Sequence, residues 1–273
     1  MTLPGRLLGK WLPAYAFLYI AFLYLPVLLL PVFSVNTAAT PRFPLQGYTL
    51  KWYESLPNTP ALLDAAWNSL VVGVAASVLA TVLGICAARA ITRYRFPGRR
   101  PINGLIMAPL VLPEIIVAVS LLIVLLQLGL ELSLFTVVLG HVLICIPYSM
   151  TVLTAGFEGF DRSLEEASAD LGETAFGTFR RVTLPMVAPA IISSLLVCFT
   201  ISLDEFILAF FLTGTEVTLP VYIWGQLRFA AKLPSVLALG TLLLIGSFLL
   251  LSVAEFLRRR AERQTRMTGT AHA

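Results

Sequence analysis

The sequence predicts an all-α, polytopic membrane protein with six transmembrane helices. Of its 273 residues, 58% are apolar and only 12% are charged, whereas about a quarter of the residues in an ordinary soluble domain are charged. Long apolar runs separate the charged residues, and each run can hold the roughly 20 residues that a helix needs to cross the hydrocarbon. A soluble, fibrous or disordered chain is therefore excluded.

The positions of the charged residues locate the six spans. Four stretches contain no charge: Lys10 to Arg42, Asp64 to Arg89, Glu131 to Glu158, and Lys232 to Glu255. They predict spans at about 13–34, 67–88, 132–155 and 235–257. Two further apolar runs contain acidic residues and predict spans at about 102–127 and 185–212. We expect the whole chain, residues 1–273, to form one membrane domain.

The distribution of lysine and arginine predicts that both termini are cytoplasmic. With six spans, both termini lie on the same side of the membrane. That side then carries 15 of the 19 basic residues, and the other side carries 4. Cytoplasmic loops are enriched in basic residues, which also explains the net charge of +4 without a nucleic-acid partner.

The connection between the fourth and fifth spans, called the 156–184 loop below, carries the strongest functional signal. Ser163 followed three residues later by Glu166 predicts a capping box at a helix start. Gly172 can end that helix, and a second short helix is expected to run to Pro185, which suits the first turn of the fifth span. Five apolar residues recur at helical spacing: Leu164, Ala167, Leu171, Ala175 and Phe179.

The first half of the 156–184 loop is strongly acidic. Between positions 158 and 173, Arg162 is the one basic residue against six acidic ones. The acidic residues are Glu158, Asp161, Glu165, Glu166, Asp170 and Glu173. A solvated loop lying on the headgroups is one alternative, but an anionic inner leaflet would repel it. A protein partner with a matching groove is the better explanation.

The 156–184 loop resembles the EAA loop of ABC-importer membrane subunits. The matching pattern is Glu166-Ala167-Ser168, three residues, Gly172, nine residues, then Val182-Thr183-Leu184-Pro185. Ser168 replaces the second alanine of the family pattern, and Val182 replaces isoleucine. The resemblance covers most of the chain and implies the type I ABC importer permease fold, in which this loop is the coupling helix. The implied ATPase-docking residues are Ser163, Glu165, Glu166, Ala167, Ser168, Asp170, Gly172, Leu184 and Pro185.

Three acidic residues inside predicted spans are candidates for a substrate path: Glu114, Asp204 and Glu205. An ionisable residue at a helix centre costs about 2.5–3.5 kcal/mol on insertion scales, and such residues usually face a water-filled path or the bundle interior. Neighbouring helix positions point about 100° apart, so Asp204 and Glu205 cannot both face one cavity. Either these acids form a route for a cationic substrate, or they anchor helices or a partner subunit.

Four segments resemble the spermidine/putrescine permease branch of the family: residues 109–116, 201–206, 210–214 and 218–220. That branch more often has two aspartates where this chain has Asp204-Glu205. The resemblance implies a permease for a polyamine such as spermidine or putrescine. The alternatives are an ABC permease for another small solute, such as an opine, an amino-acid derivative or iron, and a secondary transporter driven by an ion gradient.

The resemblance also implies partners and a location. The partners are a second permease subunit forming a heterodimer, two ATP-binding subunits, and a periplasmic or lipid-anchored solute-binding protein. The location is the bacterial inner membrane. None of the three lysines lies in a phosphate-binding GxxxxGK[ST] motif, so ATP and Mg²⁺ are expected on the partner ATPase and no cofactor on this chain. We expect a transport subunit rather than an enzyme, with no metal site, and we expect His141 and Cys145 to serve packing or an interhelical hydrogen bond.

Overall fold

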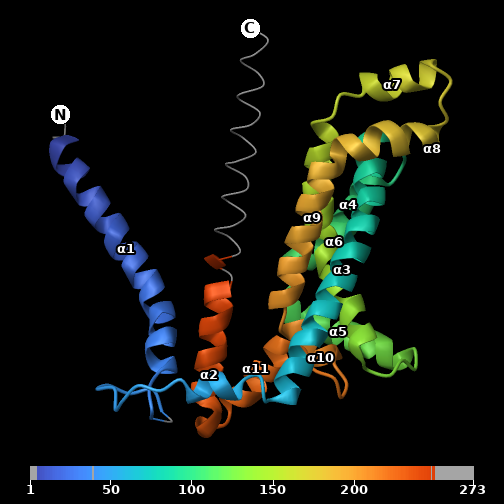
Figure 1. Ribbon diagram of the computed structural model, residues 1–273. Helices are drawn as coiled ribbons and strands as arrows, with labels where there is room; N and C mark the ends of the chain where they lie inside the picture. Colours follow the sequence, from blue (N-terminus) through green and yellow to red (C-terminus); the bar gives the residue numbers. More distant parts are fainter. Residues whose placement is uncertain (1–4, 39, 247, 250–273) are drawn as a thin grey trace. The chain divides into compact units, whose positions relative to one another are not determined.

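The computed structural model describes residues 5–38, 40–246 and 248–249. Within them the chain is helical apart from one isolated bridge between Asn36 and Tyr48 (Figure 1). The chain divides into two compact units, one of residues 1–60 with 225–273 and one of residues 61–224. The single membrane domain expected for residues 1–273 stays a prediction.

The first unit contains one long apolar helix and several shorter elements. Helix α1 (Gly5–Ser34) includes the predicted span 13–34 and exposes large side chains such as Phe17 and Phe22. None of its apolar window is buried within the chain, so this surface is left for lipid or a partner subunit. The shorter elements are α2 (Lys51–Ser55), the end of α11 (Leu219–Leu227), the 3₁₀ turn η2 (Ala230–Lys232) and an apolar helix over Ala230–Gly246.

The connection from α1 to α2 is organised around the buried side chain of Asn36. Its Oδ1 atom accepts hydrogen bonds from the backbone amides of Ala38 and Gln46, at 3.3 and 3.2 Å. The backbone carbonyl oxygen of Asn36 accepts a hydrogen bond from the indole nitrogen of Trp52 at 2.8 Å. Because one side chain satisfies several backbone groups, this connection has a defined course without regular secondary structure.

The second unit is a bundle built on three long helices. Helices α3 (Pro60–Arg93) and α6 (Leu134–Glu158), and the continuous run Ala175–Asp204, are each long and apolar enough to cross a membrane. The remaining elements are α4 (Arg99–Val111), α5 (Glu114–Gln127), α7 (Ser163–Asp170), α8 (Ala175–Thr178), the π-helical turn η1 (Phe179–Thr183), α9 (Leu184–Asp204), α10 (Ile207–Leu212) and the first part of α11. Figure 1 shows α7 and α8 at one end of the bundle and α5 and α10 at the other.

The all-α, multi-pass membrane character predicted from the sequence is confirmed. Four described helices can span a membrane, and a fifth span is formed if α4 and α5 are counted together. The count of six spans stays a prediction, because part of the sixth, 250–257, lies outside the described residues, as do the basic residues that follow it.

The predicted third span, 102–127, is not one straight helix. Helices α4 and α5 meet at an angle of 110°, and Leu112 and Pro113 between them have extended backbones. Proline cannot donate an amide hydrogen bond, and it disfavours helical geometry in the residue before it. The break therefore follows from Pro113, and it places Glu114 in the first turn of α5.

The predicted fifth span, 185–212, is also interrupted. Helix α9 ends at Asp204, Glu205 has an extended ψ of 116°, and α10 starts at Ile207. No proline or glycine lies between positions 190 and 212, so the residue types around Glu205 do not predict this break. At the other end, Pro185 lies in the first turn of α9, as predicted.

Helices α6 and α9 are joined by a row of buried polar contacts that we call the α6–α9 seam. His141 Nδ1 lies 2.7 Å from Ser202 Oγ. One turn further along, the sulfurs of Cys145 and Cys198 each contact the carbonyl oxygen of the other residue, at 3.5 and 3.6 Å. The last contact is a hydrogen bond of 2.8 Å from Ser194 to Ser149. The expectation that His141 serves an interhelical hydrogen bond is thereby confirmed.

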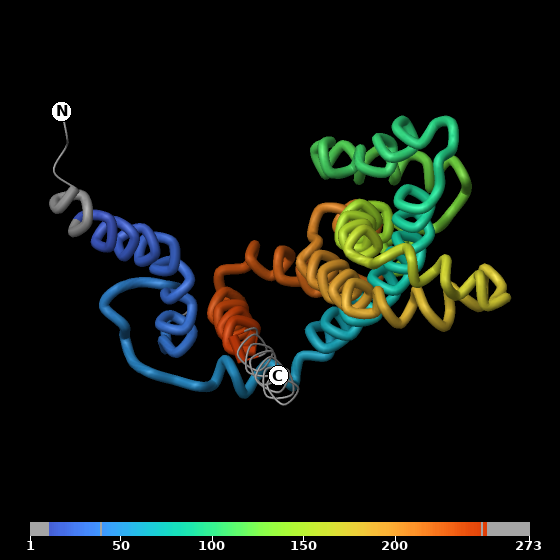
Figure 2. Tube along the Cα trace, turned by 90° about the horizontal axis from the view of Figure 1, so that it is seen from above, coloured from blue at the N-terminus to red at the C-terminus, as the bar shows by residue number. Residues whose placement is uncertain are grey.

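Small residues let the helices approach closely around the α6–α9 seam. A Cβ atom at Gly156 would lie 2.4 Å from the side chain of Ala190, and one at Gly84 of α3 would lie 2.1 Å from Ser149 Oγ. Thr81 of α3 also lies 3.1 Å from Ser194, so a third helix joins the contact. Association of helices in lipid depends on small residues and interhelical hydrogen bonds of this kind. Figure 2 shows the paths of α6 and α9 side by side.

Candidate functional site

The 156–184 loop forms two short helices, but its first helix does not start as predicted. The residue that precedes α7 is Arg162, which makes no side-chain cap, and Ser163 is the first helical residue. The amide of Ser163 instead donates to the carboxylate of Asp161 at 2.9 Å. This hydrogen bond lowers the pKa of that carboxyl below its ordinary value. The predicted capping box is therefore wrong, because Asp161 already accepts from the amide and Glu166 pairs with Arg162 at 3.1 Å.

Gly172 ends α7, as the sequence predicted. Its φ of +85° lies in the left-handed region, which glycine adopts without a steric penalty. The hydroxyl of Thr174 then accepts from the amide of Gly177 and caps α8. The expected second helix is only four residues long, and it continues through η1 into α9 without a break at Pro185. The second half of the 156–184 loop is therefore continuous with α9.

Glu165 fastens α7 to the body of the bundle. Its two carboxylate oxygens bind different helices: one lies 3.1 Å from Nε of Arg93 at the end of α3, and the other accepts a 2.6 Å hydrogen bond from Thr183 in η1. The side chains of Arg93 and Glu165 are only 13% and 15% exposed. Ser168 adds a second tie, with its hydroxyl 2.9 Å from that of Thr178. One side of α7 is thus held against α3, α8 and η1.

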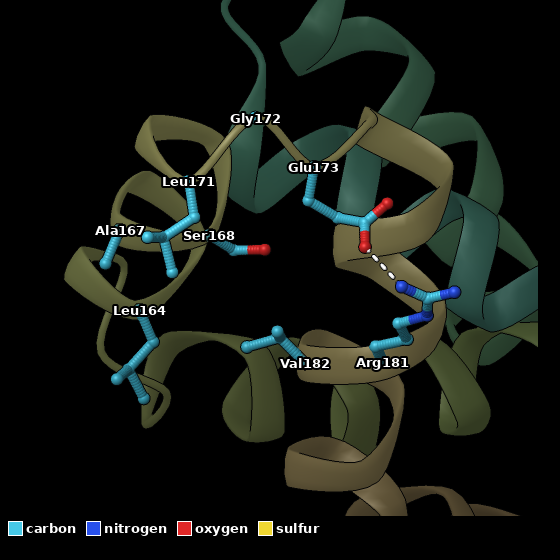
Figure 3. A pocket seen from close by; sticks show the side chains of 8 residues that line it. All are labelled: Leu164, Ala167, Ser168, Leu171, Gly172, Glu173, Arg181 and Val182. Carbon is cyan, nitrogen blue, oxygen red and sulfur yellow. Dashed lines mark hydrogen bonds and ion pairs between the residues drawn. The ribbon is translucent and has the colours of Figure 1, made fainter.

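A groove of about 520 Å³ lies between α7 and the η1 turn. Figure 3 shows the side chains that line it, with Leu164, Ala167 and Leu171 on one side and Val182 on the other. Arg181 and Glu173 form an ion pair of 2.6 Å at its edge. The groove is thus largely apolar, with charges confined to one edge, and it can receive an apolar side chain of another protein.

The outward side of the 156–184 loop combines exposed apolar residues with acids. Leu164, Leu171 and Phe176, which we call the apolar tip, are 43%, 89% and 73% exposed. Glu166 and Asp170 are exposed beside them on α7. Water solvates large apolar side chains poorly, so an exposed group of them next to a groove is typical of a protein-binding surface.

The predicted docking residues fall into two sets. Glu165, Ser168 and Leu184 are partly buried and face the chain's own helices. The exposed set is Ser163, Glu166, Ala167, Asp170, Gly172 and Pro185. Docking by these residues stays a prediction. The exposed set is available for direct contact with a partner, and among the partly buried set only Ser168 lines the groove.

The three acids considered for a substrate path have different environments. Glu205 is buried, at 7% exposure, and its carboxylate accepts a hydrogen bond of 2.9 Å from the amide of Leu208. Asp204, the last residue of α9, and Glu114, the first residue of α5, are exposed in the single chain. The expectation that Asp204 and Glu205 face different surroundings is thereby confirmed.

The two interrupted helices bring these acids into one region. Helix α5 packs against α10, and both Glu114 and Asp204 lie close enough to Glu205 to interact with it electrostatically. Among the described residues, no lysine or arginine forms an ion pair with any of the three. Membrane transporters often build solute sites where discontinuous helices meet, so the exposed acids of this region, Asp204 and Glu114, are candidates for binding a cation.

The sequence alone did not reveal the partners that hold the 156–184 loop. Arg93 is one of several basic residues between the second and third predicted spans, and no sequence motif marks Thr178. The signal for Thr183 was present, because it lies inside the family pattern. Nothing in one sequence pairs Arg93 with Glu165, since the two are 72 positions apart along the chain.

Comparisons with known proteins agree with this geometry. Residues 80–263 match the family model of the binding-protein-dependent transport system inner membrane component. The chain is 34% identical over 260 residues to the spermidine/putrescine transport system permease protein PotC of Escherichia coli strain K12, covering 93% of this chain and 95% of that protein. It is 36% identical to the putrescine transport system permease protein PotI of the same organism, covering 80% of each. The solved structure of a bacterial ABC transporter that imports alginate matches with a TM-score of 0.75 at 18% identity, covering 93% and 98%.

The ion pair between Arg93 and Glu165 should contribute more stability than the surface pair between Arg162 and Glu166. We expect a double-mutant cycle of Arg93→Ala and Glu165→Ala to give a coupling free energy of about 1–3 kcal/mol. The same cycle on the exposed Arg162–Glu166 pair should give about 0.3–0.5 kcal/mol. The measurement is the unfolding free energy of the purified chain in detergent, and equal coupling in the two cycles would contradict the inward role of Glu165.

Proposed function

This chain belongs to the binding-protein-dependent transport system inner membrane component family, and we propose that it forms the membrane path for a polyamine such as spermidine or putrescine. The chain is the permease subunit of an ABC importer. The observation that carries the substrate proposal is the group of acids at two interrupted helices, in a chain 34% identical over 93% of its length to a spermidine/putrescine permease.

The chemistry of the substrate path is electrostatic recognition rather than covalent reaction. A polyamine carries several ammonium groups, and each can be stabilised by a carboxylate in a site of low dielectric constant. Asp204 and Glu114 are exposed and lie on different helices, so they can bind two ammonium groups of one substrate.

The 156–184 loop supplies the link to ATP hydrolysis. In our proposal it is cytoplasmic and docks on an ATP-binding subunit through the apolar tip and the exposed acids Glu166 and Asp170. A matching surface on that partner has an apolar pocket with basic residues around it. When two ATP-binding subunits close on ATP, they move α7, and η1 passes the motion into α9 because no break separates them.

The α6–α9 seam determines which helices move together. The 156–184 loop joins α6 to α9, and buried hydrogen bonds tie these two helices along their length. The pair therefore moves as one body, and its far end carries Asp204 at the break before α10. Closure of the ATP-binding subunits then changes the access of the acids to one side of the membrane or the other.

The proposed assembly contains a second permease, two ATP-binding subunits and a periplasmic or lipid-anchored solute-binding protein. A heterodimeric permease core is our working proposal, in a bacterial inner membrane with both termini cytoplasmic. The family description, which refers to binding-protein-dependent systems, supports the solute-binding partner. The exposed apolar surface of α1 supports contact with lipid or the second permease.

Replacing Leu171 with aspartate should separate the permease from its ATP-binding subunits. A charge at this 89% exposed position cannot be buried in an apolar pocket without a large desolvation cost. We expect copurification of the ATP-binding subunits to fall at least about tenfold, equivalent to about 1.4 kcal/mol. Tyr48→Asp, a similarly exposed site in the other unit, is the matched control. Unchanged copurification of Leu171→Asp would contradict docking through the apolar tip.

Uptake of labelled putrescine and spermidine tests the substrate. Cells that contain all the partner subunits should take up one or both polyamines only when this chain is present. Asp204→Asn should raise the apparent KM about tenfold, since one charge–charge contact of about 1.4 kcal/mol is lost, while Asp64→Asn, an exposed acid in α3, should not. Equal uptake with and without the chain would direct the search to another small solute, and an unchanged KM in Asp204→Asn would make Asp204 structural.

A further inference from the structure

We infer that Glu205 is a positioning residue, whose carboxylate holds the break between α9 and α10 and so presents Asp204 to the substrate path. The inference rests on the proposed function, because it assigns a role within the same acidic region. It gives Glu205 and Asp204 different roles, although the two are adjacent in sequence and carry the same charge.

Glu205 and Asp204 differ in burial. Glu205 is 7% exposed, whereas Asp204 beside it is exposed. A carboxylate that binds a passing ammonium group has to be reachable from water or from the path. Glu205 is enclosed by its own chain, so Asp204 is the member of the pair that can meet a substrate.

The Glu205 carboxylate already makes a hydrogen bond within its own chain. Its Oε1 atom accepts from the amide of Leu208 at 2.9 Å, in the first turn of α10. The first amides of a helix lack partners within it, and a side-chain oxygen just before the helix commonly supplies one. Phe206, the residue at the cap position, provides no side-chain hydrogen bond. Glu205 therefore caps the start of α10.

The elements on either side of Glu205 are both anchored to α6 by hydrogen bonds. Ser202, three residues earlier on α9, is bonded to His141 of α6. At the end of α10, the carbonyl oxygen of Leu212 accepts a 2.7 Å hydrogen bond from Thr136 of α6. Leu208 and Leu212 are fully buried. Glu205 thus lies between two anchored points, Ser202 on α9 and helix α10. Its hydrogen bond to Leu208 holds the backbone at the break, where Asp204 ends α9.

Glutamine and alanine at position 205 separate the two possible roles. Glutamine keeps an oxygen that can accept from the Leu208 amide but removes the charge, whereas alanine removes both. If Glu205 is a positioning residue, the apparent KM of Glu205→Gln should stay within about twofold of the parent value. Glu205→Ala should lose most of its maximal uptake rate. Asp204→Asn is the comparison that removes a substrate-facing charge.

The experiment is polyamine uptake against concentration for these three variants in the complete transporter, with copurification of the ATP-binding subunits as the check on assembly. A KM for Glu205→Gln raised as far as that of Asp204→Asn would overturn the inference, as would parent-like uptake by Glu205→Ala. If Glu205→Ala does not assemble, the comparison of Glu205→Gln with Asp204→Asn decides the matter alone. Absence of polyamine uptake by the parent is a separate result, which counts against the proposed function.

Discussion

The hydrogen-bonded seam between α6 and α9 is the constraint on which the second unit depends. In a membrane the helices gain little from hydrophobic association with one another, so buried hydrogen bonds and close packing of small residues hold them together. Here three polar contacts recur about one turn apart, at His141–Ser202, Cys145–Cys198 and Ser149–Ser194. Because the 156–184 loop joins the same two helices, the seam connects the surface proposed for docking with the acids at the opposite end of α9.

The two helix breaks show how local backbone chemistry creates a charged region inside an apolar bundle. At the first, Pro113 ends α4 and leaves Glu114 at the start of α5. At the second, no proline is present, and the carboxylate of Glu205 satisfies the amide that the interruption leaves free. Glu114 and Glu205 therefore lie where a helix starts, and the positive end of a helix dipole stabilises a negative charge there. The cost of placing these two carboxylates in a membrane protein is lowered by the helix starts that the interruptions create.

The sequence predicted those features that depend on composition or local spacing. The membrane class and the long helices follow from apolar runs of sufficient length, and the turn at Gly172 follows from the ease with which glycine adopts a positive φ. The family pattern marked the 156–184 loop. What a single sequence could not supply were contacts between distant positions, such as Arg93 with Glu165 and Thr136 with Leu212. The start of α7 was mispredicted because Asp161 competes with Ser163 as the local hydrogen-bond acceptor.

In this mechanism α6 and α9 move as one body, and two native cysteines of the seam allow a direct test. Cys145 and Cys198 face each other across the seam, and Cys86, the remaining cysteine, is exposed and can be replaced by serine. The most direct measurement is uptake by the assembled Cys86→Ser transporter before and after a membrane-permeant oxidant joins Cys145 to Cys198. A rigid pair predicts that the disulfide forms and that the crosslinked transporter keeps most of its uptake. Loss of uptake that a reducing agent restores would show that α6 and α9 slide past each other during transport, and would contradict the account.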